Sequence, residues 1–169
     1  SPVVKLGEGA ALALSPDGRW ALAGLSSPKP RFMLLPTGAG EPKPLKIEGL
    51  EVGQSATWLP DGRLLIAANE PNRGVRLFVQ AVEGGRPRPI TPEGIGTAFP
   101  GFAVSPDGKF VAAIGSDRRG ILFPVDGGAS RTIPGIADGE FPLRFSEDGR
   151  SIYVWKRDLP ARVYHVNLD

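Results

Sequence analysis

The only histidine of the chain, His165, is the one side chain that could serve as the base of a serine-type catalytic site. It lies in a stretch, residues 162–168, in which alternate residues face opposite sides: Val163, His165 and Asn167 on one and Tyr164, Val166 and Leu168 on the other. No G-x-S-x-G motif flanks a serine. The pattern favours a histidine on a sheet surface or between sheets, and we expect no catalytic residue.

Four aspartates recur at matching places and could suggest a calcium site or a glycosidase carboxylate pair. They are Asp17, Asp61, Asp107 and Asp148. Each lies in a tetrapeptide suited to a tight turn, because proline presets φ, aspartate bonds nearby backbone and glycine accepts a positive φ. The tetrapeptides are Ser15-Pro16-Asp17-Gly18, Leu59-Pro60-Asp61-Gly62, Ser105-Pro106-Asp107-Gly108 and Ser146-Glu147-Asp148-Gly149. We therefore expect the aspartates to stabilise separate turns, too far apart to act on one bond.

Other chemistry has little support in the sequence. The absence of cysteine excludes disulfides and thiolate metal sites. Gly7-Glu8-Gly9 and Gly38-Ala39-Gly40 lack the strand-to-helix context and the lysine of a phosphate-binding loop. Trp20, Trp58 and Trp155 are more typical of packing than of stacking platforms for a ligand. The sequence predicts no cofactor, no metal and no enzymatic activity.

The turns that hold the aspartates are spaced like the repeats of a β-propeller. Their glycines lie 44, 46 and 41 residues apart, near the roughly 40 to 45 residues of a four-stranded blade. Runs that are apolar throughout, such as Phe110-Val111-Ala112-Ala113-Ile114, indicate strands covered on both faces. Third strands are expected at residues 31–35, 75–82, 121–125 and 162–168, and more polar fourth strands at 44–47, 88–91 and 131–133.

The sequence therefore predicts an all-β fold of four four-stranded antiparallel blades, as a partial or half propeller within a single domain, residues 1–169. The repeats cover about residues 10–49, 53–94, 98–137 and 140–169. The last repeat lacks a fourth strand, and residues 1–9 resemble the fourth strands elsewhere. We expect this N-terminal strand to complete the last blade in circularly permuted order.

The composition and net charge limit the classes of partner. Glycine (23) and proline (18) are abundant, yet 41% of the residues are apolar, as in a globular chain with many turns. The net charge of +2 implies neither nucleic acid nor a membrane surface, and no stretch is apolar enough to be inserted in a membrane. The sequence is compatible with a cytoplasmic, a periplasmic or an extracellular location. The chain starts at Ser1 without methionine and stops in mid-pattern, which suggests an excised segment of a larger protein.

These turns resemble the TolB-like, WD-repeat-like propeller repeats of bacteria, in which an S-P-D-G hairpin precedes an apolar strand and a later D-G-G turn. The last repeat is also similar, through Asp158-Leu159-Pro160-Ala161-Arg162-Val163-Tyr164, to propeller segments of bacterial eukaryotic-type serine/threonine kinases. The resemblance implies a non-catalytic sensor or scaffold module that binds a protein, a peptide or a small ligand. The alternative is the accessory propeller of a larger enzyme, as in peptidases whose propeller gates an α/β-hydrolase domain.

The loops between second and third strands vary from repeat to repeat and carry an excess of basic residues. We expect function on this variable face, with an acidic segment as the preferred partner. The expected partner-binding residues are Lys29, Arg31, Asn72, Arg73, Asp117, Arg118, Arg119, Lys156 and Arg157.

Assembly follows from the strand count. Four blades of this type would form an open half ring with two apolar end faces, one near Trp20 and Leu22 and one near Tyr153 and Trp155. Two chains joined head to tail would bury both faces. The sequence thus favours a homodimer that forms an eight-bladed ring over a closed monomer.

Overall fold

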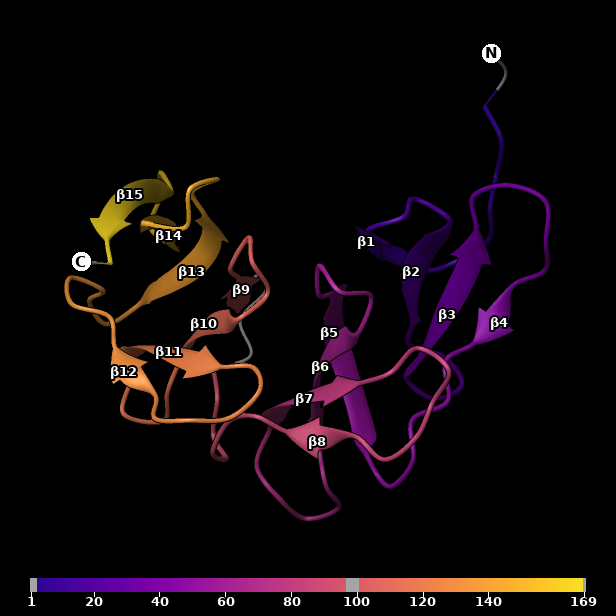
Figure 1. The fold of residues 1–169 in the computed structure, drawn as a ribbon, viewed down its shortest axis with the longest axis horizontal. Coiled ribbons are helices and arrows are strands. Elements are labelled where there is room, and N and C mark those ends of the chain that lie inside the picture. The colour runs from indigo at the N-terminus through magenta and orange to yellow at the C-terminus, as the bar shows by residue number, and fades with distance from the viewer. Residues whose placement is uncertain (1–2, 97–100, 169) are drawn as a thin grey trace. The chain divides into compact units, whose positions relative to one another are not determined.

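The structure is a computed structural model that describes residues 3–96 and 101–168, and all regular elements in these two ranges are strands (Figure 1). We call its four sheets blades. The first blade is β1 (Ala10–Leu14), β2 (Trp20–Leu25), β3 (Arg31–Pro36) and β4 (Lys43–Pro44), and the second is β5 (Glu51–Trp58), β6 (Leu64–Asn69), β7 (Arg76–Gln80) and β8 (Arg88–Pro89). The third blade is β9 (Phe102–Val104), β10 (Phe110–Ile114), β11 (Gly120–Pro124) and β12 (Arg131–Thr132), and the fourth is β13 (Glu140–Phe145), β14 (Ser151–Lys156) and β15 (Arg162–Asn167).

In every blade, strands that follow one another in the chain are hydrogen-bonded neighbours in the sheet. The chain groups into two compact units: Ser1–Asn72 with Phe78–Arg88, and Arg73–Leu77 with Pro89–Asp169. The first contains the first blade and most of the second, and the other contains the third and fourth blades. The predicted extent of a single domain stays a prediction. Among the described residues, no helix could span a membrane.

The first hairpin of three blades is held by a serine hydroxyl. Ser15 Oγ donates to Asp17 Oδ1 (2.6 Å) and accepts the N–H of Trp20 (2.9 Å), while the same carboxylate oxygen accepts the N–H of Arg19 (3.0 Å). The same bonds recur around Ser105 and Ser146. The hydroxyl thus supplies the acceptor that the first residue of the second strand needs at the turn. The predicted role of the aspartates in their own turns is confirmed.

The hairpin of the second blade is one residue shorter than the others. Trp58 pairs with Leu64, six residues later, whereas Leu14 pairs with Ala21, seven residues later. Leu59 replaces the serine here, and its side chain is fully buried. The N–H of Leu59 bonds the carbonyl of Arg63, four residues later, at 2.8 Å, whereas the N–H of Ser15 bonds the carbonyl of Trp20, five residues later.

Apolar clusters join the sheets inside each unit. In the first unit, Trp20 and Leu22 of β2 belong to a cluster that also holds Trp58, Ile66 and other residues of the second blade. The expectation that Trp20 and Leu22 form an exposed end face is therefore wrong, because this side of the first blade is covered by the second. In the other unit, the third and fourth blades share a cluster. Its buried members are Ala103, Ala112, Leu122, Ile133, Phe145, Ile152, Val154 and Leu168.

The fourth strands are short, and the last blade has none among the described residues. β4, β8 and β12 have two residues each, close to the predicted places, and the fourth blade has three strands. The predicted N-terminal strand is not formed: residues 3–9 belong to no strand, and Val3 and Val4 are exposed. Ser1 and Pro2 lie outside the described residues. A pairing of only two residues leaves little sequence pattern to predict from, which is why this expectation failed.

Candidate functional site

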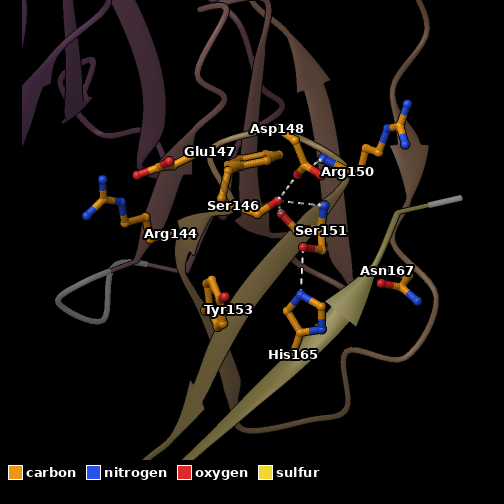
Figure 2. Close-up of a pocket in the computed structure, with 10 residues that line it drawn as sticks. Arg144, Ser146, Glu147, Asp148, Arg150, Ser151, Tyr153, His165 and Asn167 are labelled. Carbon is orange, nitrogen blue, oxygen red and sulfur yellow. Dashed lines mark hydrogen bonds between the residues drawn. The ribbon is translucent and has the colours of Figure 1, made fainter.

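A groove of about 800 Å³ lies along the fourth blade, on β13, β14 and the turn between them, with β15 as its far wall (Figure 2). It is lined by Arg144, Phe145, Ser146, Glu147, Asp148, Arg150, Ser151, Tyr153, His165 and Asn167. These residues come from all three strands of one sheet. The site is therefore built within one blade and needs no other part of the chain.

Strand alternation places most of these side chains on one face of the sheet. Phe145, Ile152, Val154 and Leu168 pack against the third blade, so the residues between them in sequence point the other way. We call the side turned away from the third blade the outer face of the fourth blade. Its groove side is formed by Arg144, Ser151, Tyr153, His165 and Asn167, and the same alternation places Trp155 and Val163 on this face as well.

The outer face is polar at positions where the third blade is apolar. Three neighbouring residues of the third blade, one each on β9, β10 and β11, pack against the fourth blade: Ala103, Ala112 and Leu122. The residues at the equivalent positions of β13, β14 and β15 in the fourth blade are Arg144, Tyr153 and His165. Phe110, which packs against the same cluster, corresponds to Ser151. In these positions the fourth blade thus has larger or more polar side chains than the third blade.

Ser151 and His165 form a hydrogen-bonded pair in the groove. The two side chains point toward each other, with Oγ 2.7 Å from Nε2, and the Tyr153 ring lies beside the imidazole at a centroid distance of 5.1 Å (Figure 2). Among the described residues, no carboxylate contacts the other ring nitrogen of His165. A triad needs such a group to orient its histidine. The nearby carboxylate of Asp148 binds Ser146 Oγ at 2.6 Å instead.

Charges of both signs border the groove. Arg144, Arg150, Glu147 and Asp148 are all exposed, so the rim has two bases and two acids. The hydrogen bond from Ser146 Oγ and the N–H of Arg150 lower the pKa of Asp148 below its ordinary value, which keeps this carboxylate ionised. Such a rim suits hydrogen bonding with a polar partner better than capture of one strongly charged ligand.

The residues predicted to bind a partner do not gather at this groove. Lys29 and Asn72 lie in loops of the first unit, and Arg31 begins β3. The Arg31 guanidinium donates to the carbonyls of Ser27 and Lys29 (2.8 and 3.4 Å). Asn72 has a positive φ of 64° in the loop between β6 and β7.

In the other unit, most of the predicted basic residues pair with acidic neighbours. Arg73 bonds Glu93 at 2.9 Å, and Arg118 bonds Asp138 at 3.1 Å. Arg119 Nε lies 3.8 Å from Asp117, and Lys156 Nζ lies 4.0 Å from Asp158. Arg157 is exposed. The basic excess of these loops is thus reduced by Glu93 and Asp138, two acids that lie outside the loops in the sequence. The predicted partner surface stays a prediction.

Sequence reasoning considered His165 but missed Arg144, Ser151 and Tyr153 as parts of one site. The signal was available in a comparison between repeats. The residue two places before the turn serine is Ala13 in the first repeat and Ala103 in the third, but Arg144 in the last. An alignment of these repeats on their turn serines therefore singles out the last repeat.

Known structures share this arrangement of blades. A chain assigned as TolB from Agrobacterium tumefaciens matches with a TM-score of 0.76 and 20% identity, over 95% of this chain and 58% of that one. TolB from Acinetobacter baumannii matches with a TM-score of 0.71 and 19% identity, over 94% and 40%. The fold is a β-propeller. A chain of the nidogen/laminin complex is also similar to this propeller, with a TM-score of 0.67 and 17% identity, over 92% and 58%.

The propeller spans less than two thirds of the length of each of these structures. No family model and no curated protein matches its sequence. Identities this low establish a shared fold but not a shared function, because one fold supports many functions. The function must therefore be argued from the site.

Proposed function

We propose that this chain is a non-catalytic propeller segment that binds another protein through the outer face of the fourth blade. The observation that carries the proposal is the replacement of Ala103, Phe110, Ala112 and Leu122 of the third blade by Arg144, Ser151, Tyr153 and His165 of the fourth. The outer face has the position of a sheet-to-sheet interface and the chemistry of an exposed surface.

The composition of the outer face suits a partner with both apolar and polar groups. Tyr153 and Val163 are 41% and 63% exposed and offer apolar area, while the guanidinium of Arg144 and the imidazole of His165 require hydrogen-bonding partners if they are buried. Tyrosine and arginine are enriched among the residues that dominate protein interfaces. A segment of another protein can supply both kinds of contact at once.

The comparison with the nidogen/laminin complex adds support of a general kind, since a propeller-like chain occurs there in a complex between proteins. It supports only the class of partner. Neither its binding surface nor its partner is transferred to this chain.

Peptide selection tests the proposal. Peptides selected from a random library on the whole chain are expected to bind at least about tenfold more weakly to the Tyr153→Ala and Arg144→Ala variants. The matched control is Arg118→Ser with Arg157→Ser, which changes the loops predicted from the sequence. Loss of binding only in the control would move the partner surface to those loops and overturn the assignment to the outer face.

An esterase assay tests the non-catalytic part. The Ser151 and His165 pair is expected to give no hydrolysis of an activated ester above that of the Ser151→Ala variant, because no carboxylate within residues 3–96 and 101–168 orients the imidazole. Turnover that depends on Ser151 would show that the pair is a catalytic dyad.

A further inference from the structure

We propose that a pocket in the first unit binds the guanidinium group of an arginine residue in another polypeptide. The pocket has a volume of about 570 Å³ and is lined by the turns β1–β2, β5–β6 and β7–β8 and by the strand ends beside them. All of its lining residues belong to the first unit. None of them lines the groove of the fourth blade, so this inference does not depend on the proposed function.

The charged side chains of the lining are mostly acidic. Asp17, Asp61 and Glu83 are lining residues, and Arg63 is the one base of the described lining. The Arg63 guanidinium pairs with Asp61, with Nη2 2.7 Å and Nε 2.8 Å from Oδ2. Glu83 is exposed, and its side chain bonds no other described residue. With Asp61 paired, the carboxylates of Asp17 and Glu83 are left to attract a cation.

Asp17 stays charged although groups of its own turn already bind it. Ser15 Oγ donates to Oδ1 at 2.6 Å, and this bond, followed by the N–H of Arg19, lowers the pKa of Asp17. The other carboxylate oxygen, Oδ2, lies 3.9 Å from the Nε of the exposed Arg19, beyond hydrogen-bonding distance. Oδ2 therefore keeps its capacity to accept a bond from a ligand.

Two tryptophans supply the apolar part of the pocket. Trp20 is half-buried, and Trp58 is only 9% exposed. Lys43, which is not a lining residue, places Nζ 5.1 Å from the centroid of the Trp20 ring, so this indole already attracts a cation of the chain itself. A guanidinium is planar and less strongly hydrated than an ammonium, and it can stack on an indole while its edge bonds carboxylates. Indole and carboxylate together favour a guanidinium.

A metal ion fits the pocket less well. Among the described residues, no three acidic, histidine or cysteine side chains are close enough together to hold one. The volume is within the range of roughly 300 to 1,000 Å³ that is typical of sites for organic ligands. A guanidinium can bridge separated carboxylates, because its five N–H groups point in different directions.

The indole N–H of Trp58 favours a guanidinium that is carried by a peptide. This N–H is buried and has no hydrogen-bond partner among the described residues. An unmet buried donor is costly, and a peptide carbonyl beside the arginine side chain would supply the acceptor. Neither a metal ion nor an isolated guanidinium ion has an acceptor to offer. The turn residues Pro16, Pro60 and Ala81 are exposed, so the pocket is open to a side chain from the surface of a partner.

The test is a titration of the isotopically labelled whole chain with Nα-acetyl-arginine amide, followed through the indole N–H signals of the tryptophans. Saturable shifts are expected for Trp20 and Trp58 at millimolar ligand, and none for Trp155 of the fourth blade, which does not line the pocket. Nα-acetyl-citrulline amide has nearly the same shape without the charge and is expected to give no shifts. No shift with the arginine compound, or equal shifts with the citrulline compound, would overturn the proposal.

Three single substitutions locate the site, each at an exposed side chain. Glu83→Gln is expected to weaken binding about three- to fivefold, since it removes one of the two available carboxylates. Glu48→Gln removes the same charge outside the pocket and is expected to bind normally. Lys43→Gln removes a competing cation and is expected to tighten binding about twofold. Equal affinities of the Glu83→Gln and Glu48→Gln variants would overturn the assignment to this pocket.

Two further ligands test which cation the pocket selects. Nα-acetyl-lysine amide carries the same charge and is expected to bind at least about threefold more weakly than the arginine compound. Equal affinity would overturn the choice of a guanidinium. Methylguanidinium lacks the peptide groups and is expected to bind more weakly and to leave the Trp58 indole signal in place. Methylguanidinium that binds as tightly as the arginine compound would overturn the assignment to a polypeptide.

Discussion

The turn serines act through two hydrogen bonds at once. Ser105 Oγ donates to Asp107 Oδ1 at 2.6 Å and accepts the N–H of Phe110 at 2.9 Å, and the residue is buried. The donated bond, followed by the N–H of Lys109, lowers the pKa of Asp107. Because the folded state holds this carboxylate in its ionised form, the hairpin is coupled to pH.

At this scale we expect Ser105→Ala to lower the free energy of unfolding at pH 7 by about 1 kcal/mol, since it leaves the part-buried N–H of Phe110 without its acceptor. Urea unfolding followed by circular dichroism measures this. Ser130→Ala, at an exposed serine just before β12, is the control and should change little. A negligible change for Ser105→Ala would show that water replaces the hydroxyl.

The pH dependence has a defined sign. The pKa of Asp107 is lowered on folding, so between the folded and unfolded values the unfolded chain binds more protons and acid favours it. The stabilisation is complete above about pH 4 and is lost as the pH falls through the lowered folded value. We expect the wild type to lose more stability than Ser105→Ala between pH 7 and pH 3. Equal losses in the two proteins would contradict the coupling.

At the scale of the elements, the four first hairpins share a chemistry without sharing a length. The turns of Ser15, Ser105 and Ser146 close in the same way, although Glu147 replaces the proline in the last one, where Gly149 N–H still donates to the Ser146 carbonyl at 3.0 Å. The longer form therefore occurs with serine, whether or not proline follows it. The one hairpin with leucine in place of serine, at Leu59, is the shorter one.

We therefore expect Glu147→Pro to stabilise the fourth blade by about 0.4 to 1 kcal/mol, because the backbone already adopts the turn that proline presets and the unfolded chain loses freedom. The measurement is the midpoint of urea unfolding. Leu59→Ala is the contrasting substitution. It should destabilise by about 2 to 5 kcal/mol, because Leu59 is fully buried in the shorter turn. A destabilised Glu147→Pro variant would show that the last turn differs in conformation from the others.

The sequence predicted the elements with strong local signals. The apolar run Phe110–Ile114 coincides with β10, and the alternation of residues 162–168 is confirmed by the burial of Leu168. The features that the sequence did not predict have no signal in the neighbouring residues of the chain. The acids that pair with Arg73 and Arg118, namely Glu93 and Asp138, are distant in sequence, and their proximity depends on how each blade folds back. The outer face was missed because its polarity is meaningful only beside the matching positions of another repeat.

At the scale of the whole molecule, the predicted homodimer depended on two apolar end faces. Trp20 and Leu22 are covered within the first unit, and the outer face of the fourth blade contains Arg144 and His165. The hydrophobic reason for head-to-tail closure is therefore weaker than the sequence suggested. The homodimer stays a prediction that the structure neither supports nor excludes.

We now expect light scattering at micromolar concentration to give a mass near 17.9 kDa. A stable species of twice that mass would restore the homodimer favoured by the sequence. In that case the Arg144→Ala and Tyr153→Ala variants would show whether the outer face takes part in the contact. A mass that does not respond to either substitution would place the contact elsewhere.

The polar outer face also bears on how such an array can grow. Propellers gain length when a repeat is duplicated, and a new repeat must find an apolar neighbour to stack on. A copy placed after the fourth repeat would meet Arg144, Ser151, Tyr153 and His165 instead of the apolar side chains that the third blade packs against the fourth. Four changes, to the alanine, phenylalanine, alanine and leucine of the third blade, would give the outer face the side chains that the third blade presents to its neighbour. An attempt to extend the chain by a further repeat would begin with substitutions at these four positions.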